Sequence, residues 1–158
     1  MRRYLPVSSI PQQTLQVQGI NDMVTAMRNV SGGSGTRRYG MYQYFAVRGF
    51  ISGGPNSQGD VLLVDGMRLQ GNRINSQLNN VEQIDVLKGP SSILYGGQAL
   101  SGAVNVIRKK PEATPAYDLF YRVGRFNTHQ VGGGATGQVF GLDRLLYRAD
   151  VSYENTDG

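Results

Sequence analysis

The residues of this chain that could perform chemistry are few and widely spaced. Cysteine is absent, which excludes disulfides, thiolate metal ligands and thiol nucleophiles together. The single histidine, His129, has no second histidine and no carboxylate pair near it in the sequence, so neither a zinc site nor a catalytic triad can be assembled around it. No serine stands in the sequence context of a nucleophile elbow. We therefore expect neither an enzyme nor a protein with a bound metal or cofactor.

A glycine-rich stretch and four charged residues invite other chemical interpretations. Residues 32–36 (GGSGT) lack the glycine spacing and the lysine of a phosphate-binding loop, and no strand is expected before them, so they predict a flexible loop. Asp60 and Asp65 flank a short apolar run, where turn-forming aspartates are a simpler explanation than a carboxylate pair. Arg48 and Lys88 each end an expected strand, which places each charge either in water at the rim of a sheet or beside carboxylates elsewhere.

Short helices and strands are expected to position these residues. Pro11 suits the first turn of a helix, and Asn21 or Asp22 can cap a second one. The apolar residues that recur at helical spacing on the second helix are Met23, Met27 and Val30. The dipeptide Asp65-Gly66 predicts a hairpin turn. The expected strands are residues 44–50, 61–64, 67–70, 84–88 and 103–107.

Beyond residues 109–115 (KKPEATP), which are typical of a linker, the pattern changes to an alternation of apolar and polar residues. Two runs, 117–125 and 145–154, have the length of about 9–10 residues that a tilted strand needs to cross a bilayer. Between them, residues 129–138 alternate more weakly and are rich in glycine, and a turn is expected at residues 141–143. A half-buried strand of a soluble sandwich produces the same period of two, so this pattern alone leaves both possibilities open.

The composition limits the class of protein further. The 158 residues and 22 glycines predict one domain, or one domain with part of another, with many turns, and no apolar run is long enough for a membrane-spanning helix. The 16 basic and 11 acidic residues give a formal charge of +5. A basic surface can bind nucleic acid, but adjacent basic pairs fall in different expected elements, so a solubilising charge is the simpler interpretation. The start of the chain lacks the apolar run of a signal peptide.

Five segments, taken in order, resemble the plug domain of TonB-dependent outer-membrane receptors, most closely the siderophore receptors. They are PQQTL with QGINDMVTAMRNVSG, FAVRGF, VLLVDGMRL, NNVEQIDVLKGPSSILYG and SGAVNVIRKKP, and the resemblance covers residues 8–111. The residues that carry the family motif are Gly49, Asp65, Gly66, Glu82, Gly89, Pro90, Tyr95, Gly96 and Asn105. The residues after Pro115 resemble the start of the receptor's β-barrel, which favours membrane strands.

The resemblance implies the fold and the domains. Residues 1–111 are expected to form an α+β plug domain, a small mixed β-sheet with short helices. Residues 112–158 are expected to form about three antiparallel strands that begin a truncated transmembrane β-barrel. In such plugs the strand that ends at Lys88 breaks at Gly89-Pro90 into a short helical turn before the sheet resumes. The chain would then be a piece of a longer transporter, a gene fragment or a truncated reading frame, that does not transport by itself.

The resemblance also implies the function and the partners. Receptors of this family bind a ferric siderophore, or a similar scarce ligand, between the outer loops of the plug and the barrel wall in a cell outer membrane of Gram-negative type. The TonB-ExbB-ExbD complex energises uptake. Arg48 and Lys88 would pair with glutamates of the chain's own barrel domain. The residues expected in ligand-facing loops are Gly54, Asn56, Gln58, Arg73 and Asn75. Of these, Arg73 could attract an anionic ferric complex or could be a solvated loop arginine.

Two other classes of protein stay open at this point. A stand-alone periplasmic ligand-binding or regulatory module derived from a plug would have no barrel sequence beside it. A nucleic-acid-binding protein would bind DNA with a steep dependence on salt. The alternation after Pro115 argues against both, so no nucleic-acid partner is expected.

Overall fold

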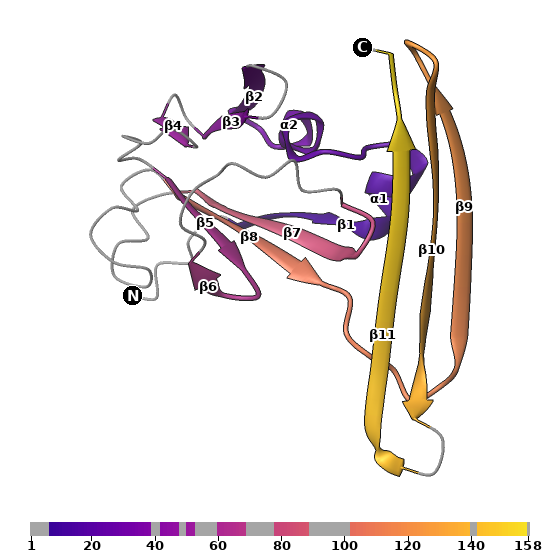
Figure 1. The fold of residues 1–158 in the computed structure, drawn as a ribbon. Coiled ribbons are helices and arrows are strands. Elements are labelled where there is room, and N and C mark those ends of the chain that lie inside the picture. The colour runs from indigo at the N-terminus through magenta and orange to yellow at the C-terminus, as the bar shows by residue number, and fades with distance from the viewer. Residues whose placement is uncertain are drawn as a thin grey trace, which may run out of the picture. The chain divides into compact units, whose positions relative to one another are not determined.

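The computed structural model describes residues 7–38, 42–47, 50–52, 60–68, 78–88, 102–139 and 142–157. The chain divides into two compact units, Met1–Arg108 and Lys109–Gly158, and each is described here by itself. The first unit contains two small sheets and short helices, and the second contains a three-stranded sheet (Figure 1). Within the described part of the chain, no helix is both long enough and apolar enough to cross a membrane.

A mixed five-stranded sheet organises the first unit. Its strands are β1 (Val7–Pro11), β5 (Asp60–Val64), β6 (Met67–Arg68), β7 (Val81–Lys88) and β8 (Gly102–Arg108). The strand order is β1-β7-β8-β5-β6, in which only β5 and β8 run parallel. The strands expected at residues 61–64, 84–88 and 103–107 are therefore confirmed. β1 was not expected, because its sequence VSSIP has no strand pattern of its own and becomes a strand by pairing with β7.

A second, antiparallel sheet has the order β2-β3-β4, with β2 (Gly33–Arg38), β3 (Tyr42–Val47) and β4 (Phe50–Ser52). The prediction of a flexible loop at residues 32–36 is wrong, because most of that stretch is β2. A Cβ atom at Gly33 would lie 2.5 Å from the carbonyl oxygen of Met27, so glycine allows β2 to pass close to the preceding helical turn. The strand expected at residues 44–50 is confirmed for residues 44–47, which lie in β3, whereas Phe50 begins a separate strand, β4.

Three short helical segments precede β2: α1 (Gln12–Val17), α2 (Met23–Ala26) and the 3₁₀ turn η1 (Met27–Asn29). α1 begins one residue after Pro11, and Gly19, with a φ of +63°, follows its end. The expected cap of the second helix is confirmed at Asp22. One Asp22 carboxylate oxygen accepts from the Thr25 amide and the other from the Thr25 hydroxyl, each at 2.9 Å.

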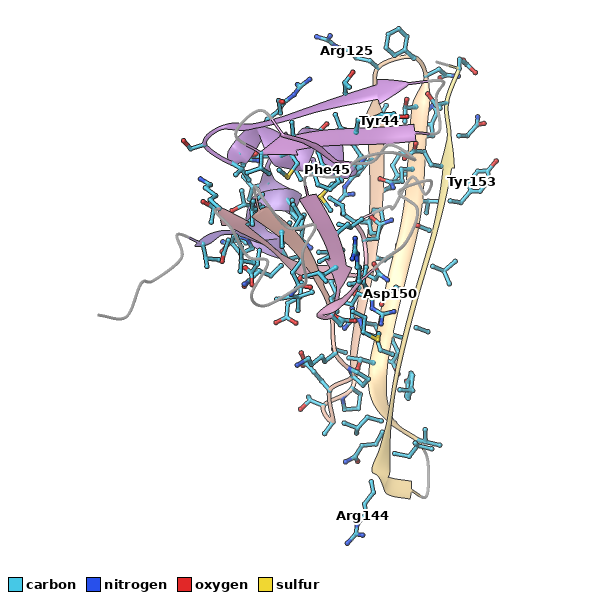
Figure 2. The ribbon with its side chains drawn as sticks, turned by 90° about the vertical axis from the view of Figure 1, so that its left-hand side faces the viewer. Tyr44, Phe45, Arg125, Arg144, Asp150 and Tyr153 are labelled. Atoms are coloured by element: carbon cyan, nitrogen blue, oxygen red, sulfur yellow. The ribbon has the colours of Figure 1, made fainter. Side chains whose placement is uncertain are left out.

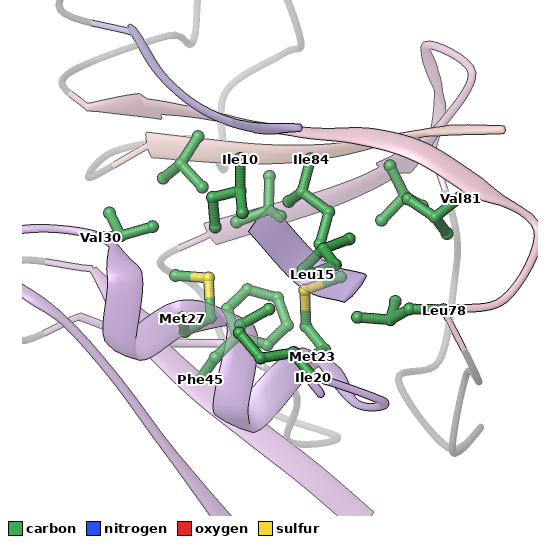
Figure 3. Packing of buried hydrophobic residues seen from close by; sticks show 14 of the residues in the cluster. Ile10, Leu15, Ile20, Met23, Met27, Val30, Phe45, Leu78, Val81 and Ile84 are labelled. Carbon is green, nitrogen blue, oxygen red and sulfur yellow. The ribbon is translucent and has the colours of Figure 1, made fainter. Parts of the chain in front are cut away.

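The core of the first unit lies between the five-stranded sheet and these helical segments (Figure 3). The residues predicted to face the core from the second helix are all buried, which confirms that prediction; they are Met23, Met27 and Val30. Ile84 of β7 is paired in register with Ile10 of β1 and with Val106 of β8, so the three side chains lie on one face of the sheet. This apolar face and the helices bury one another, which is the main stabilising contribution to the unit.

The second unit is an antiparallel sheet of three consecutive strands, in the order β11-β10-β9. They are β9 (Ala116–Gly124), β10 (Thr128–Val139) and β11 (Leu142–Asn155). All three were expected, with ends that differ by one to three residues, and β11 already begins inside the expected turn at 141–143. Residues 125–127 form the turn between β9 and β10, and two of them, Phe126 and Asn127, have a positive φ, of 57° and 51°.

The burial of Met27 predicts a measurable loss of stability. Met27→Ala should lower the free energy of unfolding by about 2–5 kcal/mol, because it removes a side chain with no exposed area from the core. Met67→Ala is the matched control, since Met67 is 66% exposed and its loss should change the free energy by less than about 0.5 kcal/mol. Urea denaturation of the chain in a membrane-mimicking detergent measures both. Equal midpoints for the two variants would contradict the described core.

Candidate functional site

The structure brings three motif residues from two distant segments together at the turn between β5 and β6. Asp65 and Gly66 have φ angles of 50° and 81°, which confirms the hairpin turn expected there. The Gly66 amide donates to Oδ1 of Asn105 at 3.0 Å. Oδ1 of Asp65 accepts from the Arg108 amide at 2.9 Å, and its Oδ2 accepts from Nε of Arg108 at 2.6 Å. The turn therefore binds the end of β8. Asp60, the other aspartate that flanks the apolar run, lies at the start of β5.

Arg108 is a functional candidate that sequence reasoning missed. It lies in a basic run (RKK) next to an expected linker, which is typical of a solvated segment. Arg108 differs from Lys109 and Lys110 because it bonds to Asp65, and this contact depends on how β8 lies beside the β5–β6 turn.

Two other predicted site residues, the motif residue Glu82 and the ion-pairing candidate Lys88, lie on β7. Glu82 is exposed at a bulge, where the register of β7 against β8 shifts between Val81 and Gln83. Lys88 is half-buried at the end of the strand, opposite Gly102. The pairing of Lys88 with a barrel carboxylate stays a prediction.

The remaining predicted site residues lie outside the described part of the chain, so the expectations for them stay predictions. They are Arg48, Gly49, Gly54, Asn56, Gln58, Arg73, Asn75, Gly89, Pro90, Tyr95 and Gly96.

A small polar network ties the edge strand β1 to its neighbour. Oδ1 of Asp85 accepts from the Ser9 hydroxyl and from the side-chain Nε2 of Gln83, each at 2.6 Å. Ser9 and Asp85 are direct partners in the β1–β7 register. This network lies on the face of the sheet opposite to Ile10 and Ile84, because neighbouring residues of a strand point to opposite faces.

One face of the three-stranded sheet is apolar and exposed. Its most exposed residues are Tyr117 (77%), Leu119 (87%), Tyr121, Val123, Val151 (75%) and Tyr153. The register pairs Gly133 of β10 with Leu119 on one side and Val151 on the other, and it pairs Val131 with Tyr121 and Tyr153 in the same way, so these residues share one face. Such a contiguous apolar surface is unusual on a protein that is surrounded by water.

The opposite face of the same sheet carries charges that pair with one another. Nε and Nη2 of Arg148 donate to the Asp150 carboxylate at 2.8 and 2.9 Å, and the Asp118 carboxylate lies 3.9 Å away. Figure 2 shows that Asp150 and Tyr153 point to opposite sides of β11. A Cβ atom at Gly134 would lie 2.6 Å from an oxygen of each of the two aspartates, so both carboxylates would have to shift if another residue replaced this glycine.

Two further contacts extend the polar face along β10. The hydroxyl of Thr136 accepts from the Glu112 amide at 2.8 Å and donates to the Tyr147 carbonyl at 3.0 Å, which fastens the linker to the sheet. Nη1 of Arg122 donates to Oε1 of Gln130 at 3.2 Å, and the same guanidinium stacks 4.6 Å from the centre of the Phe120 ring.

Both ring nitrogens of His129 have hydrogen-bond partners within its own sheet and turn, which gives this histidine a structural role. Its Nδ1 lies 2.6 Å from the Tyr121 hydroxyl, and its Nε2 lies 3.0 Å from Oδ1 of Asn127 in the turn. In the tautomer that satisfies both contacts, Nε2–H donates to Asn127 and Nδ1 accepts from Tyr121. Within the described ranges, no group of three or more His, Cys, Asp or Glu residues could hold a metal ion.

The two units together define a class of protein: a small mixed sheet with short helices, followed by antiparallel strands with one polar and one apolar face. Residues 3–103 match the family model described as TonB-dependent Receptor Plug Domain. The chain therefore belongs to the TonB-dependent receptor plug domain family. This confirms the expected fold of an α+β plug domain followed by the first strands of a receptor barrel.

Curated relatives are similar over most of this chain and a small part of their own length. The ferrichrome outer membrane transporter/phage receptor of Escherichia coli K12 is 31% identical over 94 residues, which are 58% of this chain and 12% of that protein. The catecholate siderophore receptor Fiu of the same strain is 28% identical over 147 residues, which cover 80% of this chain and 17% of that protein. The chain thus spans less than a fifth of the length of these two relatives.

Solved structures agree with this assignment. The open form of the ferric-catecholate import receptor Fiu from E. coli K12 superposes with a TM-score of 0.77 at 27% identity, over 96% of this chain and 21% of that one. The ferric yersiniabactin uptake receptor FyuA from Yersinia pestis superposes with a TM-score of 0.82 at 21% identity, over 98% of this chain and 24% of that one. The latter shows likeness of fold.

The ion cluster above Gly134 predicts that this glycine cannot be replaced freely. Gly134→Ala should destabilise the second unit by about 1–3 kcal/mol, because its methyl group would displace the two carboxylates. Gly124→Ala is the control, since a Cβ atom there would lie 3.3 Å from Cβ of Thr128 at the exposed end of β9. Denaturation of the protein in lipid vesicles measures both variants. If Gly134→Ala is no less stable than Gly124→Ala, the cluster does not have the described geometry.

Proposed function

We propose that this chain is the plug, with the first barrel strands, of a receptor in a cell outer membrane that binds a ferric siderophore and takes it up with energy from TonB-ExbB-ExbD. The observation that carries the proposal is the match of residues 3–103 to the plug family, joined to a following sheet with one apolar face. Relatives named for ferrichrome, catecholate siderophores and ferrioxamine support an iron-chelating ligand.

The apolar face of the three-stranded sheet supports the proposal that this sheet lies in a membrane, with the apolar face toward lipid. Transfer of one large apolar side chain from water to hydrocarbon contributes about 1.5–3 kcal/mol, and this face exposes several such side chains. A stand-alone periplasmic module would leave the same face in water. The strand lengths and the alternation of the two faces are those of a barrel wall.

The polar face of the sheet supports the proposal that this face lines the lumen of a barrel, and that another part of the protein fills this lumen. The guanidinium of Arg148 is only 13% exposed and is paired with carboxylates, which keeps charge away from hydrocarbon. By family likeness about 22 strands enclose the lumen, and a barrel of that size is too wide to select a ligand unless something occupies it. The plug domain would be that occupant, with Arg48 and Lys88 paired to barrel carboxylates.

Uptake measurements test the proposed function. A complete receptor that carries this sequence, expressed in a strain lacking its own siderophore receptors, should restore uptake of at least one ferric siderophore from a panel of hydroxamates and catecholates. Uptake should vanish when the tonB gene is deleted, because the plug cannot be rearranged without that energy source. Uptake that is independent of TonB, or absence of binding to every ferric siderophore, would overturn the proposal.

Arg73 tests the proposed ligand-facing loops. Arg73→Ala should weaken the binding of an anionic ferric siderophore to the complete receptor, because it removes a positive charge that would attract the complex. Arg73→Lys should retain most of the affinity, since it keeps the charge. Equilibrium binding of the radiolabelled iron complex measures both. If Arg73→Ala binds as tightly as the original receptor, Arg73 is a solvated loop residue.

A further inference from the structure

The turn between β5 and β6 directs its polar groups at the last four residues of β8. In addition to the bonds of Gly66 and of the Asp65 carboxylate, the Asp65 amide donates to the Val106 carbonyl at 2.9 Å. These bonds reach Asn105, Val106 and Arg108, and Arg108 is the last residue of the first unit.

Strand pairing alone would leave the backbone of β8 without hydrogen-bond partners beyond Val106 on the side that faces β5. β5 pairs with β8 as far as Val64 and Val106, because the chain reverses at Asp65. The Arg108 amide then lies beyond the last residue of β5, and the Asp65 carboxylate accepts its hydrogen bond. The side chains of Asp65 and Arg108 are 31% and 51% exposed, so solvent screens their charges and the hydrogen-bond geometry matters more than the Coulomb attraction.

At one edge of the sheet, β1 has fewer buried side chains than the central strand β8, although the Ser9 hydroxyl donates to Asp85 of β7. β1 has one neighbouring strand, five residues and one buried side chain, that of Ile10. Val7 is exposed, and Pro11 has no amide to donate. β8 has a neighbour on each side and is buried along most of its length. Segments with few buried contacts open at lower free energy than segments inside the core.

We propose that Asp65, Asn105 and Arg108 form a latch, which holds the end of β8 in the sheet. When the first unit opens, β1 therefore separates from β7, while β8 stays paired at the end where the chain continues to Lys109. The inference rests on the proposed function, in which the plug rearranges to let the ligand pass. Asp65 is a positioning residue in this device: it fixes the last strand of the unit and does not contact the ligand.

Amide hydrogen exchange in the complete receptor, embedded in lipid nanodiscs, tests the latch without any need for transport. Asp65→Gly fits the positive φ of the turn and removes both carboxylate bonds, whereas Asp65→Asn keeps the turn and one acceptor oxygen. The Arg108 amide should exchange about tenfold faster or more in Asp65→Gly, and much less so in Asp65→Asn. The Ile84 amide, inside the sheet, is the internal control.

Two outcomes of this measurement would overturn the latch. One is equal exchange of the Arg108 amide in the original protein and in both variants. The other, which needs no variant, is slower exchange of β1 amides than of β8 amides in the original protein.

Paired cysteines test which side of the sheet opens, in a chain that has no cysteine of its own. Ser9→Cys with Asp85→Cys joins β1 to β7, and Gln83→Cys with Ile107→Cys joins β7 to β8; each pair consists of direct cross-strand partners. The first disulfide should block siderophore uptake until a reductant is added, and the second should leave uptake unchanged. Uptake through an oxidised β1–β7 pair, or a reversible block by the β7–β8 pair, would overturn the proposal. If the original receptor does not transport, the proposed function fails while the exchange result still decides the latch.

Discussion

The first unit depends on the pairing of β8 with a strand on each side, antiparallel to β7 and parallel to β5. This double pairing satisfies the backbone of a strand that is buried along most of its length, which an apolar environment would otherwise penalise. It also places Val104 and Val106 on the face that the helices cover. Among the described residues, β1 and β6 are added at the two edges of this sheet, and the helical segments pack on its apolar face.

Close approach of backbone and side chains recurs in both units, and glycine makes it possible. At Gly33 the backbone passes a helical carbonyl, and at Gly134 it lies beneath the carboxylates of Asp118 and Asp150. In both places the absence of Cβ lets a polar group lie where a side chain would otherwise be. The glycine-rich composition thus reflects tight packing at particular points as well as turns.

The two faces of the three-stranded sheet connect its physics to the proposed role. On one face, Arg148 and Asp150 pair with each other along β11, so neither charge needs a partner in hydrocarbon. The other face presents side chains such as Leu119 and Val151 that are stable where water is absent. In the proposed receptor, a wall with these properties would separate a polar lumen from lipid, and the plug would close that lumen.

The sequence by itself determined the elements whose pattern is local: the alternation of β9 and β11, the Asp22 cap and the Asp65-Gly66 turn. The motif order also identified the family. Tertiary structure alone decided that β1 and β2 are strands, because neither has a strand pattern and each is stabilised by a partner remote in sequence or by the absence of Cβ. It alone brought Asp65 to Arg108, since hydrogen bonds between segments far apart along the chain depend on how the strands pair, and local preference does not encode that pairing.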